Sequence, residues 1–183
     1  MRAIEYKAQR PRAALRRRQG SAIVEFALVG SFIFLPLLAG LVSVGVSLVS
    51  AIQVANLNAN AGQMFAAGTD FTNAANQAIL WRVGGSLDMA DYGKVILSEI
   101  DVAPDFSLSC PNPITIGTGP GASQYVAGGA VLPAFSDLIQ TGGYTLASGQ
   151  RFYLAETFYT NPALTWVFAP ATTSKGIYMK AVF

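Results

Sequence analysis

Residues 20–49 read GSAIVEFALVGSFIFLPLLAGLVSVGVSLV, and this stretch decides the architecture of the chain. Residues 26–49 contain no polar side chain other than three serines, and the next charged residue after Glu25 is Asp70. As a helix, residues 26–49 would span roughly 36 Å, whereas the hydrocarbon core of a bilayer is about 30 Å thick. The stretch therefore predicts a transmembrane helix over residues 21–50.

Basic residues gather in front of this span. Residues 1–20 carry seven Lys or Arg and one Glu, a net charge of +6, whereas residues 21–183 carry a net charge of −4. Three arginines directly precede the span: Arg16, Arg17 and Arg18. Because Lys and Arg beside a span are retained in the cytoplasm, we expect a cytoplasmic N-terminus and the bulk of the chain outside. The basic character belongs to the N-terminal segment, so no nucleic-acid partner is expected.

Two export signals are alternative interpretations of these features. A secretory signal peptide usually has an apolar region of about 7–15 residues with a cleavage site close behind it, and the apolar run here is longer. A twin-arginine signal expects apolar residues directly after the arginines, where this chain has Gln19 and Gly20. Both interpretations are therefore disfavoured.

The overall composition argues against catalysis. The chain is 52% hydrophobic and 12% charged, with no His and one Cys, which excludes His-dependent triads, zinc clusters and an internal disulfide. We expect no enzymatic activity, no cofactor and no metal. Glu99 and Asp101 share one face of a predicted strand, and Asp88 and Asp91 lie nearby. We expect these four carboxylates to be solvated loop and edge charges, and a calcium site is the alternative. Cys110 is expected to pack as a small hydrophobe, with an intermolecular disulfide as the alternative.

Beyond the span, the helical pattern changes from uniformly apolar to two-faced. Polar and apolar residues recur at the same helical spacing, with Gln53, Asn56, Asn60 and Gln63 on one face and Val54, Leu57, Ala61 and Met64 on the other. One continuous helix can therefore leave the membrane and lay an apolar stripe on a globular head.

A second helix is predicted after Gly68, over about residues 71–81, with Thr69 or Asp70 as its cap. The side chains expected to face the core are those of Phe71, Ala75, Ala78 and Ile79. Strands are predicted over residues 94–102, 151–159, 164–168 and 176–183. The dipeptide Asn161-Pro162 predicts a turn, so residues 151–168 are a predicted hairpin.

These elements together predict an α+β protein: a long transmembrane helix that continues into a small globular head with a second helix and a mostly antiparallel sheet. The predicted divisions are a basic leader (1–20), the transmembrane helix (21–50), an extramembrane helical region (51–82) and a β-rich head (83–183). Residues 111–149, rich in Gly and Pro, are expected to form an exposed loop with a short helix over 134–140. Glu156 is expected to be an edge charge or part of an ion pair.

The most informative residues lie where the basic segment meets the apolar helix. The order is three arginines, then Gly20-Ser21-Ala-Ile-Val-Glu25-Phe26. Gly20 gives a backbone that fits a narrow protease site. Glu25 lies one turn inside the apolar helix, where an ionised carboxylate costs a few kcal/mol unless it is paired. Cleavage after Gly20 would give Ser21 a free α-amine that can neutralise Glu25 on the same or a neighbouring subunit.

This segment resembles the type IV prepilin cleavage signature, a Gly, four further residues, then Glu and an aromatic. More narrowly, residues 16–65 resemble the start of TadE-like proteins, the minor pseudopilins of tight-adherence (Flp-type) pilus systems. Residues 153–159, followed by Asn161-Pro162, are similar to the strand and turn that such proteins carry near the C-terminus.

The resemblance implies cleavage after Gly20 by a prepilin peptidase and retention of the helix in a bacterial inner membrane. It implies assembly with major pilin and other pseudopilins as a hetero-oligomer or filament, so the protein would also occur in an extracellular pilus. Flp-type major pilins are very short, whereas residues 21–183 number 163, which favours a minor, priming or tip role. The alternative from a different class is an uncleaved single-span anchor whose external domain binds a ligand.

Overall fold

The computed structural model describes residues 12–162 and 176–183, with side chains from residue 22 onward. Contacts divide the chain into two compact units, one that ends at Val44 and one from Gly45 to Phe183, which we call the head unit. The predicted strand at 164–168, and with it the second half of the predicted hairpin, lies outside the described residues.

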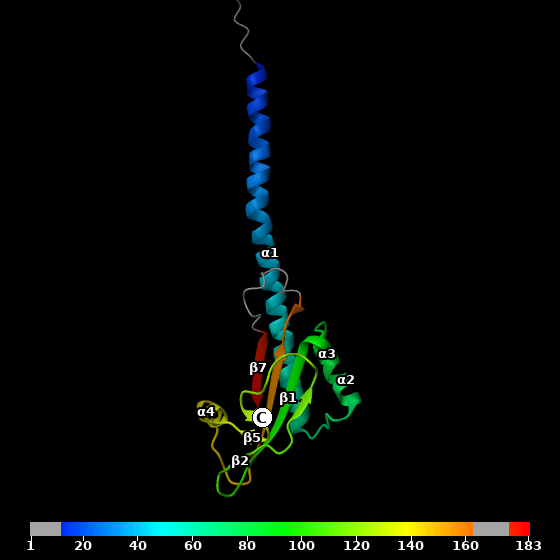
Figure 1. Cartoon of the computed structure of the whole chain (residues 1–183), viewed down its shortest axis with the longest axis vertical. Coiled ribbons are helices and arrows are strands. Elements are labelled where there is room, and N and C mark those ends of the chain that lie inside the picture. Colours follow the sequence, from blue (N-terminus) through cyan, green and yellow to red (C-terminus); the bar gives the residue numbers. More distant parts are fainter. Residues whose placement is uncertain (1–11, 163–175) are drawn as a thin grey trace, which may run out of the picture. The chain divides into compact units, whose positions relative to one another are not determined.

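Helix α1 runs over Arg12–Ala66 and continues through Pro36 (Figure 1). It therefore includes part of the predicted leader, all of the predicted span and part of the region beyond. Ser31 and Ser43 donate their hydroxyl hydrogens to the carbonyl four residues earlier, at 2.7 and 2.8 Å, so both hydroxyls are satisfied within the helix. Among the described residues, Ala22–Ala66 is the one helical segment long and apolar enough to cross a membrane, with a mean hydropathy of 2.4 over its most apolar part.

The part of α1 from Gly45 onward belongs to the head unit and carries the predicted apolar stripe into its core. Val54, Leu57 and Ala61 are completely buried, which confirms the face assigned from their spacing. Asn58 is also buried, and its Oδ1 accepts a hydrogen bond from the Thr157 hydroxyl at 2.9 Å. This polar contact between α1 and the sheet was not predicted.

The end of α1 shows why the predicted start of the second helix is wrong. Gly68 has a left-handed backbone (φ 84°), and the N–H groups of Gly68 and Thr69 bond the carbonyls of Phe65 and Met64. This arrangement is a Schellman motif, which ends a helix and satisfies its last carbonyls. Helix α2 (Ala74–Val83) follows, with Asn73 as its N-cap. The Asn73 side-chain oxygen accepts a hydrogen bond from the N–H of Ala75.

The predicted caps and core face of α2 are both corrected by this later start. The side chain of Asp70 is already used in a turn, where Oδ1 accepts from the N–H and hydroxyl of Thr72. Three of the four residues expected in the core, Ala75, Ala78 and Ile79, are exposed. Phe71 is buried, but it precedes the helix, and Leu80 is the buried side chain of α2 itself.

The sheet of the head unit is antiparallel throughout, with the order β4-β5-β2-β1-β6-β7 and β3 paired to β1 (Figure 1). Its strands and remaining helices are α3 (Met89–Tyr92), β1 (Gly93–Val102), β2 (Leu108–Ser109), β3 (Ile114–Ile116), β4 (Val126–Ala127), β5 (Ala130–Val131), α4 (Pro133–Thr141), β6 (Arg151–Tyr159) and β7 (Ile177–Val182). The strands predicted at 94–102, 151–159 and 176–183 are confirmed, and so is the α+β class with its further helix and antiparallel sheet.

The two faces of the sheet carry two separate cores. Helices α1, α2 and α3 contribute to the first core, and α4 contributes to the second. Strand β7 and the residue after it alternate between them: Ile177, Met179 and Phe183 pack on the first core, whereas Tyr178 and Val182 pack on the second. This period of two is the one that its sequence predicts.

The expectation of an exposed loop over residues 111–149 is wrong for much of that segment. It contains β3, β4, β5 and α4, the last in agreement with the predicted short helix. Tyr125, Val126, Phe135 and Ile139 are buried in the second core. The segment therefore adds three short strands to the sheet and contributes side chains to both cores, and its many glycines mark the bends between short elements.

Close packing at Gly62 gives a test of the core. A Cβ at this position of α1 would overlap the ring of Phe183, which packs on the first core. We expect Gly62→Ala to lower the free energy of unfolding by up to about 2 kcal/mol, because an overpacking cost of about 1–3 kcal/mol is only partly offset by the roughly 1 kcal/mol that Ala gains over Gly in a helix. Urea unfolding of the detergent-solubilised chain, followed by tryptophan fluorescence, measures the change.

The control is the same substitution in a Phe183→Ala background. Without the ring there is no overlap, so Gly62→Ala should then raise stability by about 0.5–1 kcal/mol through helix propensity. Equal effects in the two backgrounds would show that Phe183 does not pack on Gly62.

Candidate functional site

The residues of the predicted processing site lie on one helix. Gly20 and Ser21 are inside α1, as are Arg16, Arg17 and Arg18. The backbone at the Gly20–Ser21 bond is therefore helical, whereas proteases bind their substrates in extended form. Gly is the residue that weakens a helix most after Pro, by roughly 1 kcal/mol relative to Ala, so its presence lowers the cost of local unwinding.

Glu25 lies one helical turn after Ser21. Residues four apart in an α-helix are neighbours on one face, with a rise of about 6 Å between them. The side chains of Glu25 and Phe26 are both exposed in the single chain, and that of Phe26 is 77% exposed. The spacing puts position 21 within side-chain reach of the Glu25 carboxylate.

The helix around Glu25 is apolar on all sides, and its large side chains are exposed. Exposed hydrophobic residues follow one another on every face, including Ile23, Val24, Leu28, Val29, Phe32, Ile33, Phe34, Leu35, Leu37, Leu38, Leu41, Val42, Val44, Leu48, Val49 and Ile52. A helix that is apolar all round is typical of a segment buried in lipid or among other helices. Soluble proteins rarely expose so large an apolar surface.

The head unit contains a buried polar cluster that the sequence did not reveal. Glu156 is completely buried on β6, an interior strand between β1 and β7, which corrects the prediction of an edge charge, and the ion pairs found among the described residues do not include it. Its carboxylate accepts hydrogen bonds from the Ser123 hydroxyl, from the Gln124 N–H at 3.0 Å and from the Tyr178 hydroxyl at 2.8 Å. These neutral donors replace the hydration that the carboxylate loses on burial.

Tyr178 and Lys180 extend this cluster toward the surface. Burial, together with the hydrogen bond to Glu156, raises the pKa of Tyr178 far above its ordinary value. The Lys180 ammonium donates to the Tyr125 hydroxyl and lies 4.9 Å from the centre of that ring. Strand β7 thus connects the buried carboxylate to an exposed cation.

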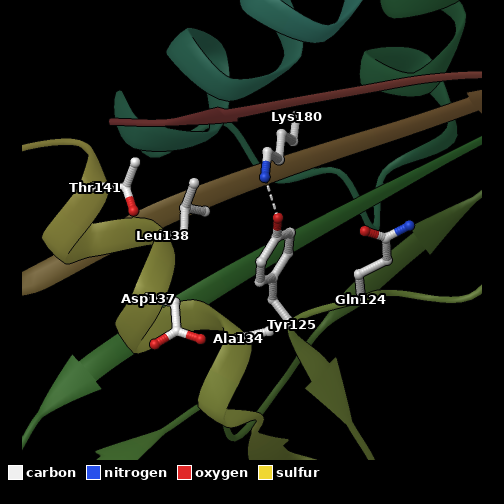
Figure 2. A pocket seen from close by; sticks show the side chains of 7 residues that line it. All are labelled: Gln124, Tyr125, Ala134, Asp137, Leu138, Thr141 and Lys180. Carbon is white, nitrogen blue, oxygen red and sulfur yellow. Dashed lines mark hydrogen bonds between the residues drawn. The ribbon is translucent and has the colours of Figure 1, made fainter.

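A pocket of about 310 Å³ opens beside Lys180 and Tyr125 (Figure 2). The remaining lining comes from Gln124 and from one side of α4, namely Ala134, Asp137, Leu138 and Thr141. Its two charged groups, Lys180 and Asp137, come from different elements, β7 and α4. The pocket has the size of a small-molecule site.

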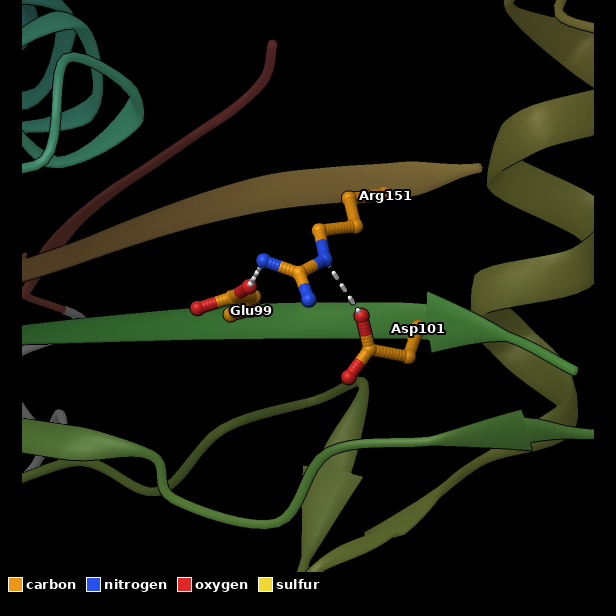
Figure 3. Close-up of polar contacts among 3 residues, drawn as sticks. All are labelled: Glu99, Asp101 and Arg151. Carbon is orange, nitrogen blue, oxygen red and sulfur yellow. Dashed lines mark ion pairs between the residues drawn. The ribbon is translucent and has the colours of Figure 1, made fainter. Parts of the chain in front are cut away.

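The strand face with Glu99 and Asp101 holds an arginine rather than a cluster of free carboxylates. Arg151 of β6 reaches across to β1, with Nη1 2.8 Å from Glu99 and Nε 3.0 Å from Asp101 (Figure 3). The two carboxylates raise the pKa of Arg151, and Asp101 contributes most. No group of three potential metal ligands occurs among the described residues.

Cys110 lies in the second core, as expected for a small hydrophobe. Its side chain is completely buried, and burial raises the pKa of its thiol. Both properties disfavour the reactive thiolate. The alternative of an intermolecular disulfide is therefore not supported by the geometry.

Replacing Glu156 tests how the chain around Ser123 is held. Glu156→Leu removes the acceptor for three donors, so we expect a loss of about 3 kcal/mol or more in the free energy of unfolding. Glu156→Gln keeps one acceptor oxygen, and we expect a loss of about 1–2 kcal/mol. Chemical unfolding of both variants measures the difference, and equal losses would mean that shape rather than hydrogen bonding matters at this position.

The described residues thus offer two functional regions, the N-terminal part of α1 and the polar cluster of the head unit. Comparisons of this chain with protein-family models, with curated protein sequences and with solved structures find no match.

Proposed function

We propose that the protein is a minor pseudopilin of the TadE-like type in an adherence pilus or a related secretion system. A prepilin peptidase removes residues 1–20, and the remaining chain assembles through its N-terminal helix. The observation that carries the proposal is the spacing of Gly20, Glu25 and Phe26 where the exposed, uniformly apolar part of α1 begins. No enzymatic role is proposed.

The exposed surface of α1 supports a location in the bacterial inner membrane. Lipid would cover this surface before assembly, and helices of major pilin or other pseudopilins would cover it afterwards. Residues 26–49 are long enough to cross the bilayer once. The arginines before Gly20 favour a cytoplasmic N-terminus with the head unit outside, and they bind anionic headgroups at the membrane surface where the peptidase works.

Glu25 supports assembly rather than simple anchoring. A carboxylate in lipid is costly, and a pure anchor gains nothing from one at this depth. Cleavage after Gly20 creates an ammonium group on Ser21, which is positioned to pair with Glu25 of its own or an adjacent chain. Such a pair fixes the axial register of packed helices, whereas apolar contacts alone allow them to slide.

The alternative function, an uncleaved anchor with a ligand-binding domain, is favoured by one observation. The pocket beside Lys180 and Tyr125 is large enough for a small ligand and has polar groups from three elements around it. An uncleaved anchor with a ligand-binding pocket does not account for the sequence at residues 20–26. The state of the N-terminus separates the two functions.

Cleavage is tested by the N-terminal sequence and intact mass of the protein from native membranes. We expect a start at Ser21 in cells with prepilin peptidase and at Met1 in cells without it. Gly20→Leu should prevent cleavage, because the bulky side chain does not fit a site shaped for Gly and also strengthens the helix. A start at Met1 in both strains would favour the uncleaved anchor.

Assembly is tested by Glu25→Ala. We expect normal cleavage but at least about tenfold less protein in purified pili or pilus-assembly complexes, which corresponds to the loss of roughly 1.4 kcal/mol in one charged pair. Asp91→Ala is a matched control that removes an exposed carboxylate of the head unit, outside the proposed helix contact. Undiminished incorporation of Glu25→Ala would contradict the pairing of Glu25 with the new amine.

A further inference from the structure

The pocket beside Lys180 and Tyr125, which we call the α4 pocket, is lined by polar groups that can bind a ligand. One side of α4 forms its first wall. Within the described part of the chain, the side chains of Gln124, Asp137 and Thr141 make no hydrogen bond or ion pair. Lys180 donates one of its three N–H groups to the Tyr125 hydroxyl and has two left. Donors and acceptors from three elements thus converge on one cavity.

The wall opposite α4 is held in place by the buried cluster around Glu156. The carboxylate accepts from the Gln124 N–H and from the Ser123 hydroxyl. The Ser123 oxygen in turn accepts from the N–H groups of Tyr125 and Val126 at 3.2 and 2.9 Å. A fully satisfied buried network of this kind makes the chain around it rigid, and a binding site needs such a pre-organised wall. The cluster therefore has a role in shaping the pocket.

The two charged groups of the lining indicate the charge of the ligand. Lys180 and Asp137 lie apart in Figure 2, on β7 and α4, and form no ion pair with each other. Lys180 repels a cation and Asp137 repels an anion, whereas a neutral ligand meets neither repulsion. An amino acid is also neutral overall, but its ammonium and carboxylate share one carbon atom and are too close together to pair with both groups. Glu156 does not line the pocket, and donors of the chain occupy its carboxylate.

The hydrogen-bonding groups of the lining indicate what the neutral ligand carries. A carboxylate only accepts and an ammonium only donates, whereas the amide of Gln124 and the hydroxyl of Thr141 do both. A ligand with several hydroxyl groups satisfies all of them, because each hydroxyl both donates and accepts. Leu138 and Ala134 add an apolar surface that suits the C–H groups of a ring. The volume of about 310 Å³ lies at the lower end of the range for ligand pockets, about 300–1,000 Å³, and therefore fits a small ligand.

We propose that the α4 pocket binds a neutral hexose, either as a free sugar or as the end of a glycan. Hydroxyl groups of the sugar donate to Asp137 and accept from Lys180, and Gln124 and Thr141 bond further hydroxyls. The C–H groups of its ring lie on Leu138. The head unit thus has a carbohydrate-binding site in addition to the proposed assembly through α1. The inference does not depend on cleavage of the N-terminus, since every residue of the pocket belongs to the head unit.

Saturation-transfer NMR tests the class of ligand on the full-length chain in lipid nanodiscs, which contain no sugar-based detergent. The probes are glucose, galactose and mannose, each compared with its uronic acid and its amino sugar at neutral pH. We expect at least one neutral hexose to bind with a dissociation constant of about a millimolar, and about tenfold more tightly than its two charged derivatives. The proposal is wrong if none of the three hexoses binds, or if a charged derivative or glycine binds more tightly than they do.

Two tryptophan variants test where the sugar binds. Ala134→Trp puts a large side chain into the pocket and should abolish binding. Gln140→Trp is the matched control, because Gln140 is an exposed residue of the same helix that does not line the pocket. This control should bind the hexose as the unaltered chain does. Equal binding by the two variants would contradict the α4 pocket as the site.

Asp137→Asn tests the charge of the pocket with little change of shape. Lys180 is then the one charged side chain in the lining, so we expect the preference between a hexose and its uronic acid to shift about tenfold toward the acid. Such a gain also shows that the variant is folded. Asp91→Ala removes an exposed carboxylate from α3 and should keep the original preference. An unchanged preference in Asp137→Asn would contradict the contact between Asp137 and the ligand.

Methyl glycosides of the hexose that binds distinguish the two sources of the sugar. Binding as tight as that of the free hexose identifies the end of a glycan, whereas loss of binding identifies a free sugar. Sugar binding is measured on the purified chain, independently of N-terminal processing and of incorporation into pili. Its failure would therefore contradict the α4 pocket as a carbohydrate site without contradicting the proposed function.

Discussion

Burial of one stripe of α1 against the sheet is the interaction on which the head unit depends. Val54, Leu57 and Ala61 fill the first core, and the bond between Asn58 and Thr157 fixes the helix against β6. A 55-residue helix satisfies its own backbone groups, so its surface alone decides what it contacts. Over residues 26–49 that surface is apolar all round, and beyond it the helix has two faces. The same helix therefore suits an apolar environment at one end and a sheet at the other.

The elements that the sequence predicts correctly are those whose pattern reflects a single local environment. The stripe on α1 repeats every three or four residues because one side is buried, and β7 alternates because each face meets its own core. Strands β1 and β6 pair over nine residues, Gly93–Asp101 with Arg151–Tyr159, and both are rich in β-branched and aromatic residues. Their boundaries follow from composition alone, although their partners do not.

The features that the sequence does not predict depend on contacts between distant residues. Two of the three donors to Glu156 come from Ser123 and Gln124, more than 30 residues earlier, and the third is Tyr178, 22 residues later, so nothing near Glu156 indicates its burial. Three nearby residues, Thr69, Asp70 and Asn73, have side chains that can cap α2. Asn73 is the cap, because the Asp70 carboxylate accepts its hydrogen bonds from Thr72 instead. The Gly-rich segment 111–149 has the sequence pattern of a loop because its strands have only two or three residues, too few to show a period.

In the proposed pathway, cleavage changes the electrostatics of the helix as well as its length. Before cleavage the nitrogen of Ser21 is a neutral amide, which offers the Glu25 carboxylate no positive charge. Afterwards an ammonium group would be available one turn away, and pairing with it would lower the cost of moving the Glu25 carboxylate from the membrane edge into a packed bundle. The same cut would remove seven basic residues, which in this pathway hold the chain to anionic headgroups. Both changes favour exchange of lipid for protein contacts, so processing would control the order of assembly without any change in the head unit.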